Sequence, residues 1–328
     1  MDVLYLAEAD VERLIPMPTA LEAVEAAFRA LADGRAENHP RRRFHPAPGV
    51  FFHYMAASDS SCGYFGMKLY TSSPAGTRFL VPLYRSESGQ LVALLEADFL
   101  GRTRTGAASG LATKLMARAD AARLGLLGSG RQAPTQLEAI ARVRRLREVR
   151  VYSPNPERRR AFAERMSAKL GLRVEAVDTA EAAVREADIV AVVTNAKQPV
   201  LAGAWLPAGT HVNAVGANFP QKRELDDAAI ARADRIVVDS LEQSRDEAGD
   251  LIVPFQAQPE RWQQVRELSE VVAGRFPGRG SAQEITLFKS NGVALEDVAT
   301  AARVYERALQ EGVGRRMAMW EAEKRLSG

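Results

Sequence analysis

The sequence predicts an α/β protein with two domains: a doubly wound parallel sheet, preceded by a mixed α+β domain whose strands are mostly antiparallel. Three observations lead to this prediction. The first hundred residues contain several β-like runs and few helical segments. From residue 123 onward, short apolar runs alternate with amphipathic helical segments, as in parallel sheets covered by helices. The chain has 328 residues, which is enough for two domains of ordinary size.

The expected elements of the first domain are one helix and four strands. Apolar residues between Pro18 and Gly34 recur at helical spacing, which predicts a helix over 18–33. The strands are expected at 50–57, 64–73, 79–85 and 91–97. Because the turn sequence SESGQ separates the last two strands, we expect them to form a hairpin.

The second domain is expected to follow a helix rich in small residues, over 102–119, that packs closely on a neighbour. A strand leading into a turn is predicted at its start, in RLGLLGSG (123–130), and further buried strands are predicted at 188–195, 210–216 and 235–240. The end of the chain has helical spacing and is expected to return to the first domain. The predicted boundaries are therefore 1–118 together with a C-terminal helix 303–328, and 119–302 for the parallel sheet.

Composition limits the class of protein. The chain is 46% hydrophobic and 26% charged, and no apolar run approaches the ~20 residues needed to span a bilayer. Its first residues lack the basic start and apolar core of a secretory signal. The single cysteine, Cys62, excludes an internal disulfide and any multi-cysteine metal site. We therefore expect a cytoplasmic protein that uses no metal and does not bind a membrane.

The formal charge of +3 raises the question of nucleic-acid binding, which uses a basic face with aromatic platforms. The basic run at 142–150 contains no aromatic residue and falls on a predicted helix, where solvated arginines are common. The run at 41–45 precedes apolar strands, which is more typical of hydrogen-bond donors positioned at a binding site. We expect no nucleic-acid partner.

A glycine-rich turn follows the first strand of the predicted parallel sheet. Gly128, Gly130 and Ala133 match the pattern G-x-G-x-x-[GA] of a dinucleotide-binding Rossmann domain. The first glycine permits the tight turn, the second lets a pyrophosphate approach, and the small third residue lets helix and strand pack closely. The turn follows a strand and opens a helix, which is the context that supports a cofactor site. Arg131 and Gln132 belong to the same predicted site.

The end of the next strand indicates which nicotinamide cofactor is used. An acidic residue is expected there to hold the ribose 2′-hydroxyl of NAD. Here Ser153 and Asn155 occupy the region, and Arg158 follows. These side chains donate hydrogen bonds and do not repel a 2′-phosphate. The sequence therefore predicts NADP(H) as the preferred cofactor and NAD(H) as the alternative.

Several stretches together resemble the ornithine cyclodeaminase/mu-crystallin family. They are GMKLYTSS (66–73), RTGAASGLATKLMAR (104–118) leading into GLLGSGRQAPTQLEA (125–139), NAVGANFPQKRELDD (213–227) and TLFKSNGVALEDVATA (286–301). The resemblance implies an N-terminal substrate and dimerisation domain, a Rossmann domain, a homodimer, and hydride transfer between nicotinamide and the α-carbon of an amino or imino acid.

The resemblance also assigns residues. One of the arginines at 41–43, with Arg41 favoured, together with Lys68 and Arg104, would bind the substrate carboxylate. Lys68 interrupts an apolar strand, where an unpaired lysine would be costly. Arg104 is expected at a helix start, where its charge opposes the helix dipole unless it meets an anion. The residues that would line the nicotinamide end are Thr194, Val215, Ser290 and Gly292.

One position departs from the family pattern. Ornithine cyclodeaminases carry an aspartate, assigned to amine binding and acid–base work, where this chain has Asn218. An amide does not take up a proton at neutral pH. The sequence therefore favours NAD(P)H-dependent reduction of an α-imino acid, reversible as an amino-acid dehydrogenase. Two alternatives stay open: a cyclodeaminase-like enzyme that recycles NAD internally, and a non-catalytic NADPH-dependent binding protein for small ligands, of the mu-crystallin type.

Overall fold

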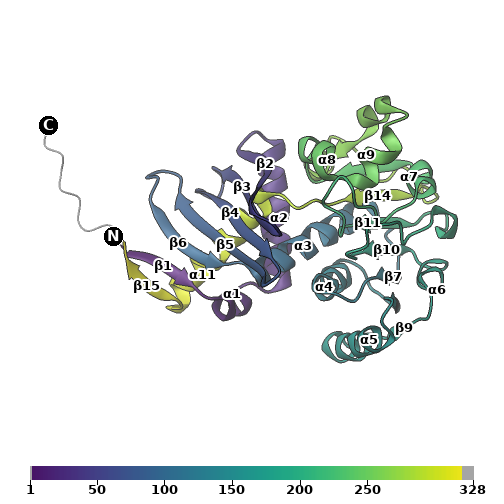
Figure 1. The fold of residues 1–328 in the computed structure, drawn as a ribbon, viewed down its shortest axis with the longest axis horizontal. Helices are drawn as coiled ribbons and strands as arrows, with labels where there is room; N and C mark the ends of the chain where they lie inside the picture. Colours follow the sequence, from purple (N-terminus) through teal and green to yellow (C-terminus); the bar gives the residue numbers. More distant parts are fainter. Residues whose placement is uncertain (1, 320–328) are drawn as a thin grey trace, which may run out of the picture. The chain divides into compact units, whose positions relative to one another are not determined.

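The computed structural model describes residues 2–319, which form two compact units, each built around one sheet (Figure 1). Unit 1 comprises Met1–Arg104 and Val293–Gly328, and unit 2 comprises Thr105–Gly292. Both boundaries fall earlier in the chain than the expected 118/119 and 302/303. The first lies inside a continuous helix, α3 (Asp98–Met116), so no change in local pattern marks it in the sequence.

The sheet of unit 1 has seven strands in the order β15-β1-β6-β5-β4-β3-β2. They are β1 (Asp2–Leu6), β2 (Ala36–Ala47), β3 (Val50–Asp59), β4 (Tyr64–Ser73), β5 (Gly76–Arg85), β6 (Leu91–Glu96) and β15 (Arg315–Ala318). All neighbours are antiparallel except β1 and β6. The four predicted strands and the β5–β6 hairpin are confirmed.

Two strands in the N-terminal part of unit 1, β1 and β2, were not predicted from the sequence. In β2, two prolines and a run of arginines hide the alternation of a strand. The structure explains how this composition is tolerated, because β2 forms the edge of the sheet, where proline does not break a hydrogen-bonded ladder on both sides. The other strand, β1, is only five residues long.

The helices of unit 1 are α1 (Glu8–Leu14), α2 (Met17–Ala32), α11 (Ala294–Glu311) and the first part of α3. The helix predicted over 18–33 corresponds to α2. Helix α11 lies across β3, β4 and β5 and beside α2 (Figure 1). The helix predicted over 303–328 is wrong beyond Glu311, because Gly312 ends it in the left-handed conformation and β15 follows. Residues 320–328 of that prediction lie outside the described residues.

Unit 2 contains an eight-stranded parallel sheet in the order β13-β12-β14-β11-β10-β7-β8-β9. The strands are β7 (Arg123–Leu127), β8 (Glu148–Tyr152), β9 (Val174–Ala176), β10 (Ile189–Val192), β11 (His211–Ala214), β12 (Arg235–Val238), β13 (Arg266–Glu267) and β14 (Thr286–Lys289). The predicted doubly wound sheet is confirmed. The chain order reverses between β7 and β10, which is the place where such sheets bind ligands.

The helices of unit 2 cover two hydrophobic cores, one centred on Val190 and Val212 and the other on Leu126 and Val151. These helices are the second part of α3, then α4 (Ala133–Val143), α5 (Pro156–Leu170), α6 (Ala180–Val184), α7 (Asp227–Arg232), α8 (Leu241–Glu247), α9 (Gly249–Phe255) and α10 (Leu268–Val272), with 3₁₀ turns η1 (Gly203–Trp205) and η2 (Pro259–Gln264). The central strands of this sheet are almost wholly buried beneath the helices, and this burial explains their apolar runs in the sequence.

The predicted close packing of the small-residue helix is confirmed. A Cβ added at Gly106 of α3 would lie 2.5 Å from the carbonyl oxygen of Thr135 in α4. The guanidinium of Arg144 then closes the C-terminal end of α3 by donating hydrogen bonds to the carbonyls of Thr113, Ala117 and Arg118. Helix α3 is therefore packed closely against α4, the helix that follows the glycine turn.

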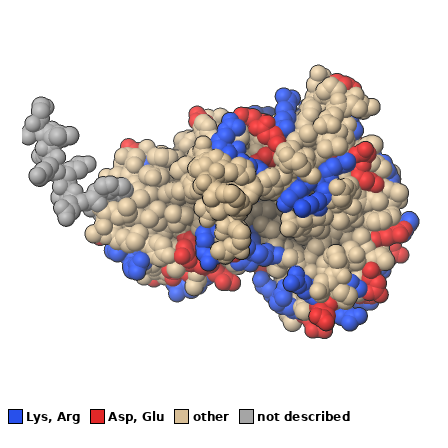
Figure 2. Space-filling view, in the orientation of Figure 1, with Lys and Arg blue, Asp and Glu red and all other residues tan. Residues whose placement is uncertain are grey.

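Two structural findings concern membrane spans and metal sites. No helix within residues 2–319 is both long and apolar enough to cross a membrane. Over the same residues, no group of three or more His, Cys, Asp and Glu side chains is placed to hold a metal ion. Figure 2 shows basic and acidic side chains mixed over the visible face.

Candidate active site

The glycine turn of unit 2 has the geometry that dinucleotide phosphates require. Gly128 follows β7 with φ +112°, and a Cβ there would lie 2.6 Å from the carbonyl oxygen of Val193. A Cβ on Gly130 would meet nothing within 4 Å, so the fold itself does not demand glycine at that position. Ala133 is wholly buried and begins α4. The strand, turn and helix are arranged as the motif predicts, and the open side of Gly130 fits an approaching pyrophosphate.

The residues expected near the ribose lie at the end of β8. Ser153 is buried, and its hydroxyl lies 2.8 Å from that of Ser129 in the glycine turn. Asn155 caps α5 by accepting a hydrogen bond from the backbone N–H of Arg158, whose side chain is exposed. The intervening Arg159 faces inward, donates to the carbonyl of Ser153 and pairs with Asp178. Of the arginines after β8, Arg159 therefore has a structural role.

The residues assigned to the nicotinamide end lie at the carboxyl ends of neighbouring strands. Thr194 follows β10, Val215 follows β11, and Ser290 and Gly292 follow β14. The backbone N–H of Val215 donates to Val192, and that of Ser290 donates to Ala214. Together with the glycine turn, these residues occupy one edge of the sheet in unit 2, as a bound dinucleotide requires.

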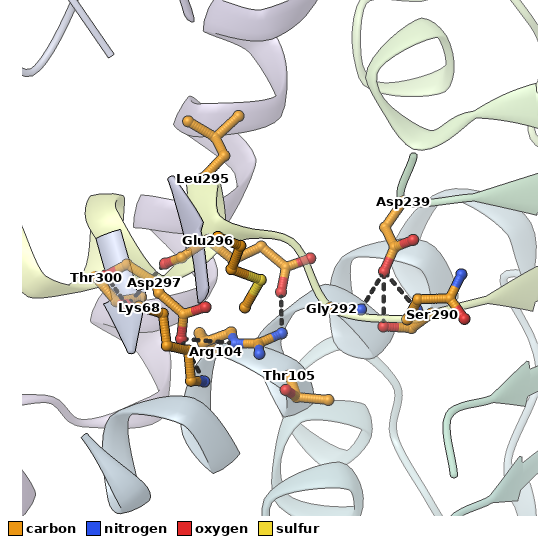
Figure 3. Close-up of polar contacts among 12 residues, drawn as sticks. Lys68, Arg104, Thr105, Asp239, Ser290, Gly292, Leu295, Glu296, Asp297 and Thr300 are labelled. Carbon is orange, nitrogen blue, oxygen red and sulfur yellow. Dashed lines mark hydrogen bonds and ion pairs between the residues drawn. The ribbon is translucent and has the colours of Figure 1, made fainter. Parts of the chain in front are cut away.

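A carboxylate that the sequence analysis missed fixes the segment after β14. Asp239 is wholly buried, and its Oδ2 accepts hydrogen bonds from the hydroxyl of Ser290 and the backbone N–H groups of Asn291 and Gly292 (Figure 3). Burial raises the pKa of Asp239, while the hydrogen bonds from Gly292 and Asn291 oppose that effect. In the sequence, Asp239 is a single aspartate after an apolar strand, and nothing there indicates that it holds the segment after β14.

In unit 1, the three predicted carboxylate-binding residues are all buried. Lys68 lies on β4, Arg104 on α3 and Arg41 on β2. Of the arginines at 41–43, Arg41 is the buried one, and its Nη2 lies 3.8 Å from the sulfur of Met55. Met55 pairs with Lys68 across β3 and β4. The charge of Arg41 is close enough to Lys68 to contribute to lowering its pKa.

Two acidic residues at the start of α11 hold this cluster together, and the sequence analysis missed both. The Oδ1 atom of Asp297 accepts hydrogen bonds from Lys68 Nζ at 2.9 Å and from Arg104 Nε at 3.0 Å (Figure 3). Glu296 Oε2 lies 2.7 Å from Arg104 Nη1. Both carboxylates are wholly buried in the first turn of α11, where the helix dipole favours negative charge. Adjacent acids inside the otherwise apolar GVALEDVATA were the available signal.

The cluster shifts the protonation of its cations in opposite directions. Burial lowers the pKa of Lys68 to about 8, because the carboxylate of Asp297 only partly offsets burial and the repulsion from Arg104. For Arg104, burial also acts to lower the pKa, but the carboxylates of Asp297 and Glu296 outweigh it and raise the pKa. Lys68 and Arg104 therefore combine an amine that can exchange a proton near neutral pH with a permanent cation.

One expectation about these residues needs correction. Arg104 does not lie at a helix start, because α3 begins at Asp98, and it meets carboxylates of the protein itself. Lys68, whose burial without a partner would be costly, is paired with Asp297. Asn218 is half-buried in the segment that follows β11 of unit 2, whereas Lys68, Arg104 and Arg41 belong to unit 1.

Comparison with known proteins identifies the family of the chain. Residues 1–312 match the model of the ornithine cyclodeaminase/mu-crystallin family. The chain belongs to this family. Among the family's curated members, a Delta(1)-pyrroline-2-carboxylate reductase of Bacillus cereus is 40% identical over 260 residues, covering 77% of this chain and 80% of the relative.

Solved structures extend the family similarity to nearly the whole chain. The Delta(1)-pyrroline-2-carboxylate reductase of Thermococcus litoralis, in complex with NADH and L-proline, is 38% identical, with a TM-score of 0.92 over 95% of this chain and 99% of that one. An archaeal alanine dehydrogenase dimer with bound NAD is 35% identical, with a TM-score of 0.92 over 98% of this chain and 100% of that one. These relatives are oxidoreductases acting on amino and imino acids.

Proposed function

We propose that the chain is an NAD(P)H-dependent reductase of α-imino acids, linear or cyclic, that also runs in reverse as an amino-acid dehydrogenase. The observation that carries this proposal is the buried pair of Lys68 and Arg104, held by Asp297, in a chain that also contains the glycine turn of a dinucleotide-binding sheet. Relatives that reduce pyrroline-2-carboxylate and oxidise alanine support the same reaction class.

The residues of unit 1 would bind the α-carboxylate and hold the α-carbon in place. Arg104 presents a guanidinium whose charge does not change with pH in the working range, and a guanidinium forms strong paired hydrogen bonds with a carboxylate. Glu296 and Asp297 fix its orientation, so little rotamer freedom is lost on binding. Arg41 and Lys68 would contribute the remaining donors.

Lys68 would also supply the proton that the reaction needs. When bound, a reduced nicotinamide supplies the hydride that the α-carbon accepts. The C=N double bond becomes a single bond as carbon gains the hydride and nitrogen gains a proton from the ammonium of Lys68. Because the pKa of Lys68 is about 8, most of this lysine is protonated at neutral pH and the residue can still release a proton.

The chemistry of position 218 argues against ring-forming deamination. That reaction needs a carboxylate to bind the side-chain amine and to move protons, and Asn218 provides neither charge nor base. A cyclodeaminase would also show no net consumption of dinucleotide. Net oxidation of the cofactor during turnover therefore separates the reductase from the cyclodeaminase.

NADPH is the preferred dinucleotide in this proposal. No carboxylate occupies 153–155 at the end of β8, and the exposed side chain of Arg158 lies in the first turn of α5. The relatives described above hold NADH or NAD, so both dinucleotides must be compared. We expect a lower KM for NADPH; a clear preference for NADH would overturn this part of the proposal.

We further propose that the protein forms a homodimer through unit 1. Strand β2 leaves one edge of the sheet without a neighbour among the described residues, and Phe44 and Tyr54 on adjacent strands are exposed. Phe52 packs between them, 5.3 Å from Phe44 and 6.2 Å from Tyr54 between ring centroids. Light scattering should give a molar mass twice that of the chain, and Phe44→Glu should lower the measured molar mass.

We place the protein in the cytoplasm, consistent with its lone thiol, Cys62.

A dinucleotide-oxidation screen tests the proposed reaction. The panel contains pyruvate or glyoxylate with ammonia or methylamine, oxaloacetate with ammonia, and five- and six-membered cyclic imino acids. Two matched variants test the site. Arg41→Met, at the buried arginine, should raise the KM for the imino acid, whereas Arg42→Met, at the exposed arginine next to it, should leave this KM unchanged. Tight NADPH binding without turnover of any compound would instead support a small-ligand-binding protein of the mu-crystallin type.

A further inference from the structure

A further buried carboxylate lies in unit 2, in the segment between β11 and α7. Glu224 is wholly buried and accepts four hydrogen bonds. Its Oε1 receives the backbone N–H and the hydroxyl of Thr194, at 2.6 and 2.7 Å. Its Oε2 receives the backbone N–H groups of Gly216 and Ala217, at 2.6 and 2.9 Å. One side chain thus joins the residues that follow β10 to those that follow β11.

A second layer of charges supports Glu224. Asp250 is wholly buried and accepts hydrogen bonds through Oδ1 from the backbone N–H groups of Glu224 and Leu225. Lys289 Nζ lies 3.2 Å from the other oxygen of Asp250 and donates to the carbonyl of Ala217. Burial raises the pKa of Glu224 to about 7, with Lys289 acting against burial and Asp250 adding to it.

The two segments that Glu224 joins are held unusually close. A Cβ added at Gly216 would lie 2.1 Å from the carbonyl oxygen of Thr194, so the backbones leave no room for a side chain. Strands β10 and β11 are neighbours, and β10 also adjoins β7, which leads into the glycine turn. Glu224 therefore acts at the sheet edge that holds Thr194 and Val215, the residues that the family resemblance assigns to the nicotinamide end.

We propose that the Glu224 carboxylate is a positioning residue for the nicotinamide end of the dinucleotide, because it fixes Thr194 relative to Gly216 and Ala217. This inference rests on the proposed function. Although burial raises the pKa of Glu224, its ionised form is the one that fits these partners, since three of the four are backbone N–H groups that can only donate. In Glu224→Gln, the amide nitrogen would face donors of its own kind and the two segments would separate.

Binding of two probes to the full-length protein tests this role. NADPH has a nicotinamide end, whereas 2′-phospho-ADP-ribose shares the adenosine, phosphates and glycine-turn contacts but lacks the nicotinamide. We expect Glu224→Gln to weaken NADPH binding about tenfold, or ~1.4 kcal/mol, and to change 2′-phospho-ADP-ribose binding by less than about twofold. Glu224→Asp keeps the charge but shortens the side chain, and should give an intermediate loss with the same selectivity for the nicotinamide end.

A matched control separates positioning from general loss of structure. Asp188 also accepts two backbone N–H groups, those of Ala122 and Arg123, but it precedes β10 and lies at the opposite end of that strand. Asp188→Asn should lower the melting temperature without changing the ratio of the two dissociation constants. Equal weakening of both probes in Glu224→Asp, or no weakening of either, would overturn the inference. Failure of the unaltered protein to bind either probe would instead refute the proposed cofactor.

Discussion

Replacing Asp297 by asparagine tests whether the buried carboxylate sets the proton affinity of Lys68. The substitution keeps the size of the side chain and an oxygen that can accept a hydrogen bond, but removes the charge. Asp297 Oδ1 lies 2.9 Å from Lys68 Nζ, and Asp297 is the strongest influence that opposes burial on this lysine. Without it, burial and the repulsion from Arg104 remain, and both lower the pKa of Lys68.

The size of the effect follows from the geometry. An opposite charge at this distance typically shifts a pKa by about 1–3 units, so the pKa of Lys68 should fall from about 8 to roughly 5–7. The reduction uses protonated Lys68, so its rate declines as pH rises through this pKa. With a pKa of roughly 6, about a tenth of the lysine would stay protonated at pH 7, and kcat/KM would drop about tenfold there.

The assay is the pH dependence of kcat/KM for imino-acid reduction, measured in the unaltered protein and in Asp297→Asn. The unaltered protein should lose activity as pH rises through about 8, and the variant should lose it at lower pH. The reverse oxidation uses the neutral amine and should gain activity over the same range. Asp98→Asn, at an ion pair with Arg102 at the start of α3, is the control that should not shift the profile. An unchanged midpoint in a folded Asp297→Asn variant would mean that Asp297 does not set the proton affinity of Lys68.

Two further predictions concern stability and cofactor binding. Arg144→Ala removes the donors that bind the carbonyls of Thr113, Ala117 and Arg118 at the end of α3. In urea titrations it should lower the free energy of unfolding by about 2–3 kcal/mol. The control is Arg145→Ala, at an exposed neighbouring position, which should change the free energy of unfolding by less than about 0.5 kcal/mol. Gly130→Ala should leave the melting temperature unchanged, because nothing lies within 4 Å of the new Cβ, but weaken dinucleotide binding at least about tenfold, since that Cβ would occupy the approach of the phosphates. Equal unfolding energies in the first pair, or unchanged affinity in Gly130→Ala, would contradict these accounts.

The fold could be predicted largely because its signals are local. The parallel sheet of unit 2 is covered on both faces, so its strands read as apolar runs between helices. The glycine turn could be predicted for the same reason. The positive φ of Gly128 and the small side chain of Ala133 are required by one short segment of the chain. Strand β2 escaped prediction because an edge position tolerates the prolines that normally exclude a strand.

The supporting carboxylates of the site could not be predicted in the same way. Lys68 and Asp297 are separated by 229 positions in the chain, and Asp239 and Gly292 by 53. Periodicity describes neighbours along one element and carries no information about such pairs. The motif residues were visible because their types are unusual where they stand, whereas the partners that neutralise or orient them are recognisable only once the sheet and α11 have brought them together.

The most direct test of the central claim follows the hydride itself. The protein is supplied with a five-membered cyclic imino acid and a reduced dinucleotide that carries deuterium at the transferable position of the nicotinamide. We expect net oxidation of the dinucleotide and proline that carries one deuterium at its α-carbon. Proline without deuterium, or formed without net oxidation of the dinucleotide, would contradict the assignment of this chain as an imino-acid reductase.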